Sequence, residues 1–98
     1  MEQKEIHEQE LAFIDPKKLG LSSRIKIGRR SDREFYIVID RKSRIIMHDG
    51  ERIEKIASII KKRNPETNVA LATSTAVCSK TKAYLATRKI SIKKLKTN

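Results

Sequence analysis

The sequence contains no tryptophan and only two tyrosines and two phenylalanines among its 98 residues. A core built from it must therefore be aliphatic, filled mainly by isoleucine, leucine, valine and alanine. No apolar run approaches the ~20 residues that a membrane-spanning helix needs. The single cysteine excludes an internal disulfide, and the acidic, polar start of the chain does not resemble a secretory signal. We therefore expect one domain over residues 1–98, in a soluble cytoplasmic protein.

Acidic residues are missing from the last third of the chain, where none follows Glu66. That segment contains seven lysines and arginines, whereas residues 1–15 contain five acids and one lysine. The whole chain has 23 Lys+Arg against 12 Asp+Glu, a formal net charge of +11. Such a positive field raises the affinity for polyanions and predicts a nucleic-acid partner. Two alternatives are an anionic protein partner and no polyanion at all, since heat-adapted proteins are also rich in lysine, arginine and glutamate.

The N-terminal segment has a helical pattern. Apolar residues recur at near-helical spacing in residues 4–14, and a proline at position 16 ends the pattern. This predicts an acidic N-terminal helix within residues 1–15. Residues 15–23, with a proline, a glycine and two serines, are expected to form a connector.

Three apolar segments then follow in close succession. Residues 24–30 alternate charged and apolar side chains, as a half-exposed strand does. Residues 34–40 are almost continuously apolar and rich in β-branched and aromatic residues, which is typical of a strand covered on both faces. Residues 44–48 would return antiparallel across a tip at residues 41–43. Together the segments predict a three-strand meander.

The second half of the sequence alternates helical and strand patterns. Residues 51–64 place isoleucines on one face of a helix, for which Asp49 is a natural N-cap. Residues 68–73 predict a short buried strand, residues 74–89 a second helix, and residues 90–95 a final strand. A strand–helix–strand unit of this kind implies parallel pairing through a crossover.

These elements together define the expected fold. The predicted order is helix, three-strand meander, helix, strand, helix, strand, and residues 96–98 would form a free basic tail. We expect the α/β (or α+β) class, with a single mixed sheet and the helices packed on it.

Two carboxylates and a lysine near the meander suggest a catalytic alternative. A metal-dependent nuclease needs two carboxylates to hold Mg²⁺, and often a lysine to orient or activate water. Asp40 and Lys42 would share one face if their strand continued through position 42, and Asp32 precedes Asp40 by one strand length. Asp49 or Glu51 would be further candidates beside them.

The predicted order of elements resembles the core of the PD-(D/E)xK nucleases, the restriction-endonuclease and Holliday-junction-resolvase group. The resemblance covers residues 4–95 as a pattern and implies Mg²⁺-dependent cleavage of nucleic acid. In this group the acidic-x-Lys pair lies on the strand after the one that the first aspartate opens. With Asp32 as that aspartate, the pair should fall near residues 47–49, which contain no lysine. The motif is degraded or displaced here, and a polar hairpin tip is the other interpretation of Asp40 and Lys42.

Basic residues are the broader signal for binding. Eight of them lie within residues 24–44, and two more lie on the outer face of the second predicted helix. These candidate phosphate contacts are Arg24, Lys26, Arg29, Arg30, Arg33, Arg41, Lys42, Arg44, Lys80 and Lys82. Arginine binds phosphate through two donors, and a twisted two-stranded ribbon can follow a nucleic-acid backbone. The alternative is a solvated face whose cations pair with nearby acids or with the acidic N-terminal helix.

Hydroxyl groups mark a candidate phosphate seat between the predicted strand of residues 68–73 and the second helix. Ser74 and Thr75 would place hydroxyls beside the free N–H groups of a helix N-terminus, although a simple N-cap is the other interpretation. Cys78 follows as a candidate packed thiol. One cysteine and two histidines give no zinc pattern, so we expect no metal site of that kind.

The sequence therefore predicts a small basic protein that binds nucleic acid through phosphates, with low sequence specificity and without a cofactor. A Mg²⁺-dependent nuclease is the enzymatic alternative. The third hypothesis is an interaction subunit or homodimer that uses its basic face.

Overall fold

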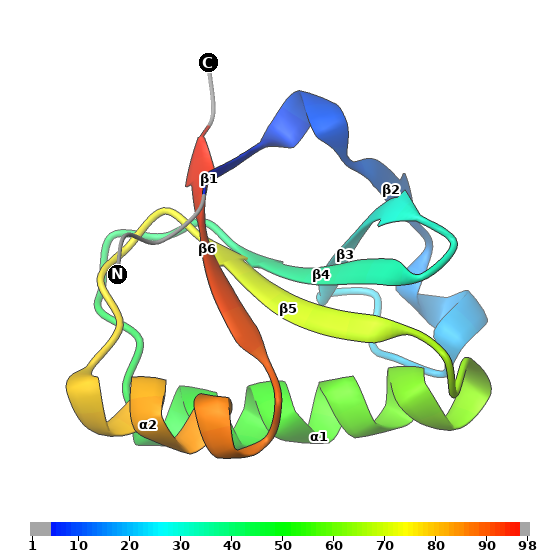
Figure 1. Cartoon of the computed structure of the whole chain (residues 1–98). Helices are drawn as coiled ribbons and strands as arrows, with labels where there is room; N and C mark the ends of the chain where they lie inside the picture. The colour runs from blue at the N-terminus through cyan, green and yellow to red at the C-terminus, as the bar shows by residue number, and fades with distance from the viewer. Residues whose placement is uncertain (1–4, 97–98) are drawn as a thin grey trace.

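The computed structural model describes residues 5–96, which form one curled sheet of six strands with two helices packed on one of its faces (Figure 1). The elements are β1 (Glu5–His7), the 3-10 turn η1 (Glu8–Glu10), β2 (Ala12–Ile14), the 3-10 turn η2 (Pro16–Leu19), β3 (Lys26–Ser31), β4 (Glu34–Ile39), α1 (Met47–Arg63), β5 (Asn68–Thr73), α2 (Ser79–Thr87) and β6 (Ser91–Lys96). The strand order is β1-β6-β5-β4-β3-β2. This confirms the predicted class, a mixed sheet covered by helices. Within residues 5–96, no helix has the length and apolarity needed to cross a bilayer.

The parallel half of the sheet follows the sequence pattern closely. β4, β5 and β6 run parallel to one another, and α1 and α2 connect them in turn. β5 begins and ends at the predicted residues, 68 and 73. β4 occupies a central position between β5 and β3, which explains why its middle four residues are buried.

The antiparallel half contains a meander, but its third strand differs from the prediction. β3 and β4 pair antiparallel as expected. Residues 44–48 do not return beside β4: Ile45 forms a single parallel bridge with Val77, and α1 already begins at Met47. The remaining strand of the meander is β2, which pairs with β3.

The predicted N-terminal helix is wrong. Residues 5–14 form β1, η1 and β2 instead, and we call this segment the N-terminal strap. β1 pairs with β6 at one edge of the sheet and β2 pairs with β3 at the other. Six strands laid flat at ~4.8 Å spacing would separate these edges by about 24 Å. Residues 8–11 cover the distance in four residues of ~3.5 Å each, so the sheet must curl.

The strap and the helices cover opposite faces of this sheet. On the helix side, the largest fully buried side chains include Ile37, Ile53, Ile60, Leu71 and Leu85. On the strap side, a smaller apolar cluster joins the strap to the central strands. It consists of Ile6, Leu11, Tyr36, Val38, Ala70, Ala72 and Leu95.

The helix boundaries differ at their N-termini from those predicted. Asp49 is not the N-cap of α1 but lies inside the first turn, where its carboxylate accepts a hydrogen bond from the Ile46 N–H at 3.0 Å. The C-terminus of α1 is as predicted, since Asn64 follows its last residue. α2 begins at Ser79 rather than at residue 74. Of the predicted free tail, Lys96 belongs to β6, and residues 97 and 98 lie outside the described residues.

Candidate nucleic-acid interface

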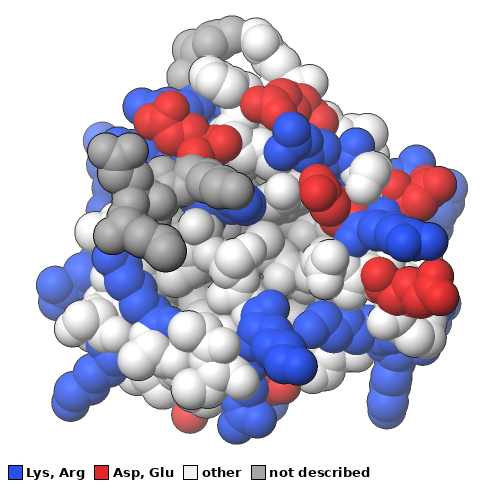
Figure 2. Space-filling model, viewed as in Figure 1, with Lys and Arg blue, Asp and Glu red and all other residues white. Residues whose placement is uncertain are grey.

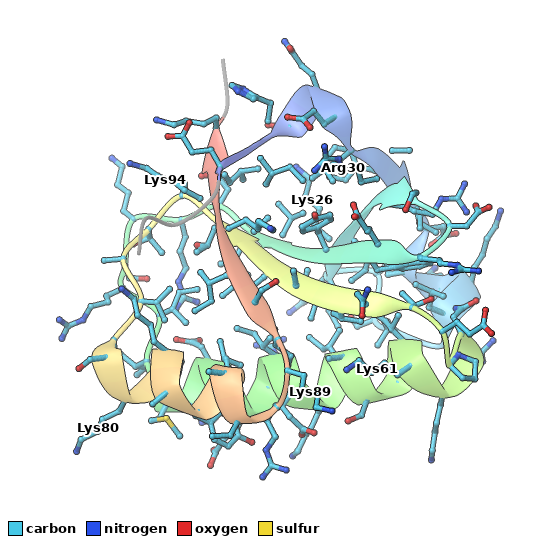
Figure 3. The ribbon with its side chains drawn as sticks, viewed as in Figure 1. Lys26, Arg30, Lys61, Lys80, Lys89 and Lys94 are labelled. Atoms are coloured by element: carbon cyan, nitrogen blue, oxygen red, sulfur yellow. The ribbon has the colours of Figure 1, made fainter. Side chains whose placement is uncertain are left out.

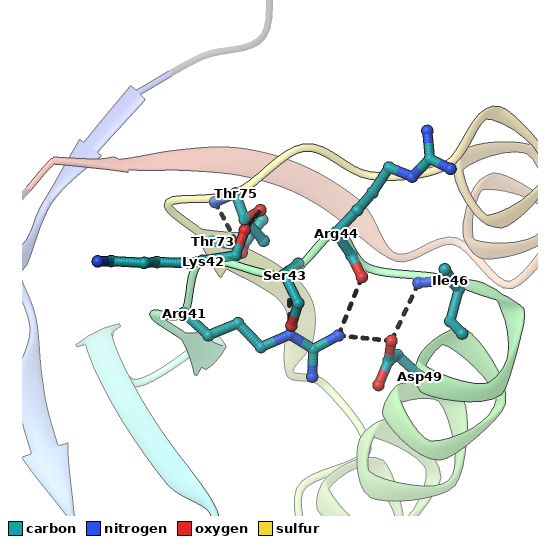
Figure 4. Close-up of polar contacts among 8 residues, drawn as sticks. All are labelled: Arg41, Lys42, Ser43, Arg44, Ile46, Asp49, Thr73 and Thr75. Atoms are coloured by element: carbon teal, nitrogen blue, oxygen red, sulfur yellow. Dashed lines mark hydrogen bonds and ion pairs between the residues drawn. The ribbon is translucent and has the colours of Figure 1, made fainter.

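Two loops meet at the carboxyl ends of the parallel strands, the usual location of binding sites in open α/β sheets. They are residues 40–46 after β4 and residues 74–78 after β5 (Figure 4). The Ser74 hydroxyl donates to a carboxylate oxygen of Asp40 at 2.5 Å, and the Thr75 hydroxyl donates to the Lys42 carbonyl at 3.3 Å. The loops therefore form one connected unit.

This connection changes the interpretation of the predicted phosphate seat. Ser74 and Thr75 lie before α2 rather than at its first turn, and Cys78 is the N-cap. Both hydroxyls are used to join the loops, so Ser74 or Thr75 as the N-cap of α2 is wrong. Their role as a phosphate seat stays a prediction.

Arg41 stabilises the first of these loops from within. Its guanidinium donates to the carbonyls of Ser43 and Arg44 at 3.1 and 3.2 Å, and to the Asp49 carboxylate at 2.6 Å (Figure 4). This hydrogen bond, more than any other contact, lowers the pKa of Asp49. The Arg41 charge is thus engaged in folding the loop onto the start of α1.

The predicted phosphate-contacting cations fall into two groups. Five of them are paired with acids. These pairs are Lys26–Glu8 at 3.7 Å, Arg29–Asp32 at 3.9 Å, Arg30 with Glu10 and Glu34 at 3.6 and 3.9 Å, Arg33–Glu66 at 3.9 Å and Arg41–Asp49 at 2.6 Å. The other five have no ion-pair partner within residues 5–96, and they are Arg24, Lys42, Arg44, Lys80 and Lys82. The hairpin that carries the densest basic sequence is therefore partly neutralised.

Four of the cations without such partners lie at the two connected loops and the start of α2, and we call them the loop–α2 basic surface. They are Lys42, Arg44, Lys80 and Lys82. In Figure 4 the Arg44 side chain extends toward α2, whereas Lys42 extends away from it. Figure 2 shows the acids gathered mainly in the upper half of that view, and the lower left, where α2 lies, mostly blue and white.

The acid-free end of the sequence contributes four further cations outside the loop–α2 basic surface. Arg88 and Lys89 follow α2, and Lys93 and Lys94 lie on β6. None of the four has an ion-pair partner in the described part of the chain; Lys80, Lys89 and Lys94 are labelled in Figure 3. The absence of acids after Glu66 was the sequence signal for these cations.

The pKa of the Cys78 thiol reflects the positive electrostatic potential at the start of α2. The backbone N–H groups of Lys80 and then Thr81 lower the pKa of its thiol, and the charge of Arg44 adds to the effect. A lowered thiol pKa means that negative charge is favoured at this point. The N-terminus of α2 and the Arg44 charge thus lower the pKa of this thiol in the same direction.

The three residues predicted to be catalytic do not come together. Asp32 lies in the turn before β4, with its side chain 97% exposed, and Asp40 follows the other end of the strand. Six strand residues at ~3.3 Å each separate them by about 20 Å, whereas a Mg²⁺ ligand lies within ~2.1 Å of the ion. The Lys42 side chain extends into solvent (Figure 4).

The two additional carboxylates do not complete a metal site either. Asp49 is held by Arg41, and Glu51 is exposed on α1. Among residues 5–96, no group of three His, Cys, Asp or Glu side chains could hold a metal ion. The residues present therefore do not fit the Mg²⁺ that the family resemblance implies.

A cleft of about 270 Å³ lies between the β3–β4 pair and α1. Its floor includes Ile37 and Ile53, and Asp40, Arg41 and Arg52 lie at its rim. Lys26 of β3 also lines this cleft, so it borders both the first loop and the β3–β4 pair.

Two solved structures of EndoMS have a fold similar to that of this chain. EndoMS in its apo form matches with a TM-score of 0.58 and 18% identity, over 72% of this chain and 33% of that chain. The EndoMS–dsDNA2 complex matches with a TM-score of 0.59 and 18% identity, over 72% of this chain and 30% of that chain. The fold is similar to that of EndoMS.

The similarity to EndoMS covers only part of that protein and concerns the fold. This chain spans about a third of the length of the EndoMS chains, and at 18% identity the match concerns the fold alone. It supports the expected resemblance to a nuclease-type fold, but not the PD-(D/E)xK motif. The sequence matches no protein-family model and no curated protein at a significant level.

Proposed function

We propose that this protein binds nucleic acid through phosphate groups, with low sequence specificity, at the loop–α2 basic surface. The observation that carries the proposal is the separation of the cations into two groups. Those of the hairpin have acidic partners, whereas Lys42, Arg44, Lys80 and Lys82 have none among the described residues. Cations without an acidic partner can contact a phosphate and release its counterions without first giving up an ion pair.

Low specificity follows from the kind of side chain that this surface presents. Lysine and arginine contacts with phosphates position a protein on a nucleic acid but carry no sequence information. The exposed side of α2 offers lysines and alanines, with few groups that could read base edges. Because one EndoMS structure is a complex with dsDNA, the fold likeness supports a duplex as one ligand.

Binding of labelled DNA duplexes of unrelated sequence, measured by fluorescence anisotropy over a salt series, tests this proposal. For four phosphate contacts, the logarithm of the affinity should fall with the logarithm of the salt concentration with a slope of about −3.6. Affinities for the different duplexes should agree within a few-fold. No binding at ~50 mM salt would end the proposal and favour the interaction-subunit or homodimer hypothesis.

A pair of matched variants locates the surface. The triple variant Arg44→Ala/Lys80→Ala/Lys82→Ala should weaken duplex binding strongly and reduce the salt slope by nearly three units. The control Arg29→Ala/Arg30→Ala/Arg33→Ala removes the same charge from ion-paired positions and should have a much smaller effect. Equal losses in the two variants would show that only net charge matters, and would make the assigned surface wrong.

The nuclease alternative has only the fold likeness in its support. Its proposed residues Asp32, Asp40 and Lys42 lie apart, and residues 5–96 contain no group of three His, Cys, Asp or Glu side chains that could hold a metal ion.

A further inference from the structure

Phe13 is exposed in a protein that has few aromatic side chains. It lies on β2 with 46% of its surface exposed, whereas Phe35 and Tyr36 are 5% and 3% exposed. Packing therefore accounts for the buried rings but not for Phe13. Single exposed apolar side chains are common on protein surfaces, so a ligand at Phe13 is indicated only by the groups around the ring.

Cations surround this ring. The Lys26 ammonium lies over one face of the ring, 4.6 Å from its centroid, so a stacked base would use the opposite face. Phe13 also lines two hollows, one of about 370 Å³ shared with His7 and Lys96 and one of about 330 Å³ shared with Arg24 and Lys26. Phe13 is the described residue common to both, so the hollows flank it.

One acid lies in the same place. Glu8 lines the first hollow and pairs with Lys26 at 3.7 Å, with side-chain exposures of 38% and 50%. Exposed pairs of this length contribute little free energy, and a phosphate can replace the carboxylate. The surroundings of Phe13 therefore remain suited to an anionic ligand with a flat apolar part.

We propose that Phe13 is a stacking platform for an unpaired base of single-stranded nucleic acid, with Lys26 and Arg24 contacting the adjacent phosphates. This inference rests on the proposed function and extends it to a second ligand form. Aromatic stacking uses the face of a base, which only an unpaired base presents to a side chain. The duplex contacts proposed above use other residues, so the two ligand forms can be separated by mutation.

The experiment compares a fluorescent twelve-residue oligothymidylate with a twelve-base-pair duplex, by anisotropy at one salt concentration. Phe13→Ala should weaken oligothymidylate binding about tenfold, the effect expected of one lost stacking contact. Duplex binding should change less than twofold. Phe13→Tyr keeps an aromatic face and should retain binding, whereas Phe13→Leu keeps only the apolar volume and should behave like Phe13→Ala.

Thermal unfolding of each variant checks the fold independently, and a half-exposed ring should shift the midpoint little. Oligothymidylate affinity within twofold of wild type in Phe13→Ala would overturn the inference, as would an equal loss for the duplex. Wild-type protein that binds the duplex but not oligothymidylate would overturn this inference and leave the proposed function intact. Binding to neither would overturn both.

Discussion

The guanidinium of Arg41 lies 2.6 Å from the carboxylate of Asp49, which also accepts the Ile46 N–H at 3.0 Å. The two side chains are 35% and 18% exposed, so the pair is shielded from much of the solvent. One carboxylate thereby satisfies a donor at the start of α1 and holds the loop that carries Lys42 and Arg44. The stability of this end of the molecule and the shape of the loop–α2 basic surface depend on the same contact.

Replacing Asp49 should reveal this contact in the pH dependence of stability. The hydrogen bond from Arg41 keeps the pKa of Asp49 below its ordinary value of 3.8 in the folded protein. Its stabilisation is therefore complete above the ordinary pKa and is lost as the pH falls through the lower folded-state pKa. Asp49→Asn should reduce the free energy of unfolding by about 1 kcal/mol at pH 7, as measured by urea denaturation.

The same variant provides the acid control. Between about pH 5 and pH 2, wild type should lose more stability than Asp49→Asn, because only wild type still has this carboxylate to protonate. Parallel stability curves for the two proteins over that range would contradict the role given to the pair.

Gly50 should resist replacement by alanine although it lies within a helix. An alanine Cβ at this position would lie 2.8 Å from the Thr81 Cγ2, on a fully buried β-branched side chain of α2. Overpacking of this kind costs ~1–3 kcal/mol, which exceeds the ~1 kcal/mol gained from helix propensity. Gly50→Ala should therefore lower the midpoint of urea unfolding.

Thr81→Ser tests that explanation, because it removes only the Cγ2 methyl group. In the double variant, the cost of Gly50→Ala should be smaller than in the wild-type background. Strictly additive free energies would show that the helix packing is not the cause.

The elements that the sequence predicted correctly are those whose hydrophobic pattern follows from their own burial. The continuous apolarity of residues 34–40 and the helical spacing of isoleucines in α1 each depend on a single element and its environment. A helix was wrongly predicted for residues 5–14 because their glutamates, alanine and leucine favour that conformation. Pairing with β3 and β6 determines their actual conformation. Such pairing with distant strands leaves no local signature.

The candidate site was harder to predict for a related reason. The sequence identified the cations and nearby acids that could pair with them, but it could not show which pairs form. Lys26 and Glu8 are brought together by the strap, and Asp40 and Ser74 are separated by 34 positions. Which charges remain without partners is a property of the folded chain. The hairpin has the most basic sequence, yet most of its cations are ion-paired, whereas those of the loop–α2 basic surface have no such partner within residues 5–96.

The strap acids should restrain binding near Phe13. Glu8 and Glu10 pair with Lys26 and Arg30, both of which Figure 3 shows on the strap side of the sheet. Glu8→Gln/Glu10→Gln should raise the affinity for oligothymidylate by roughly two- to tenfold at low salt, since two cations lose their competing partners. Anisotropy titrations measure the change.

A control for net charge is available on α1. Glu51→Gln/Glu54→Gln removes the same two charges away from the strap and should raise the affinity less. If the two double variants gain equally, the strap has no local effect.

Cleavage assays address the nuclease hypothesis directly. Because Asp32 and Asp40 lie at opposite ends of β4, we expect no cleavage of duplex or single-stranded DNA with Mg²⁺ or Mn²⁺. Asp40→Ala should change the free energy of unfolding by about 1 kcal/mol at most, through the lost bond to Ser74. Metal-dependent cleavage that disappears in both Asp32→Ala and Asp40→Ala would contradict the geometry described above.

The pairing of β1 with β6 has a consequence for how the protein is made. Residues 5–7 are synthesised almost ninety positions before their strand partner at residues 94–96. Until then Ile6 and Leu11 have no completed cluster to enter. Contacts between such distant residues form slowly, because a long loop must close first. The strap is therefore expected to be the last part of the sheet to assemble, and the nascent chain to be most prone to aggregation just before β6 emerges.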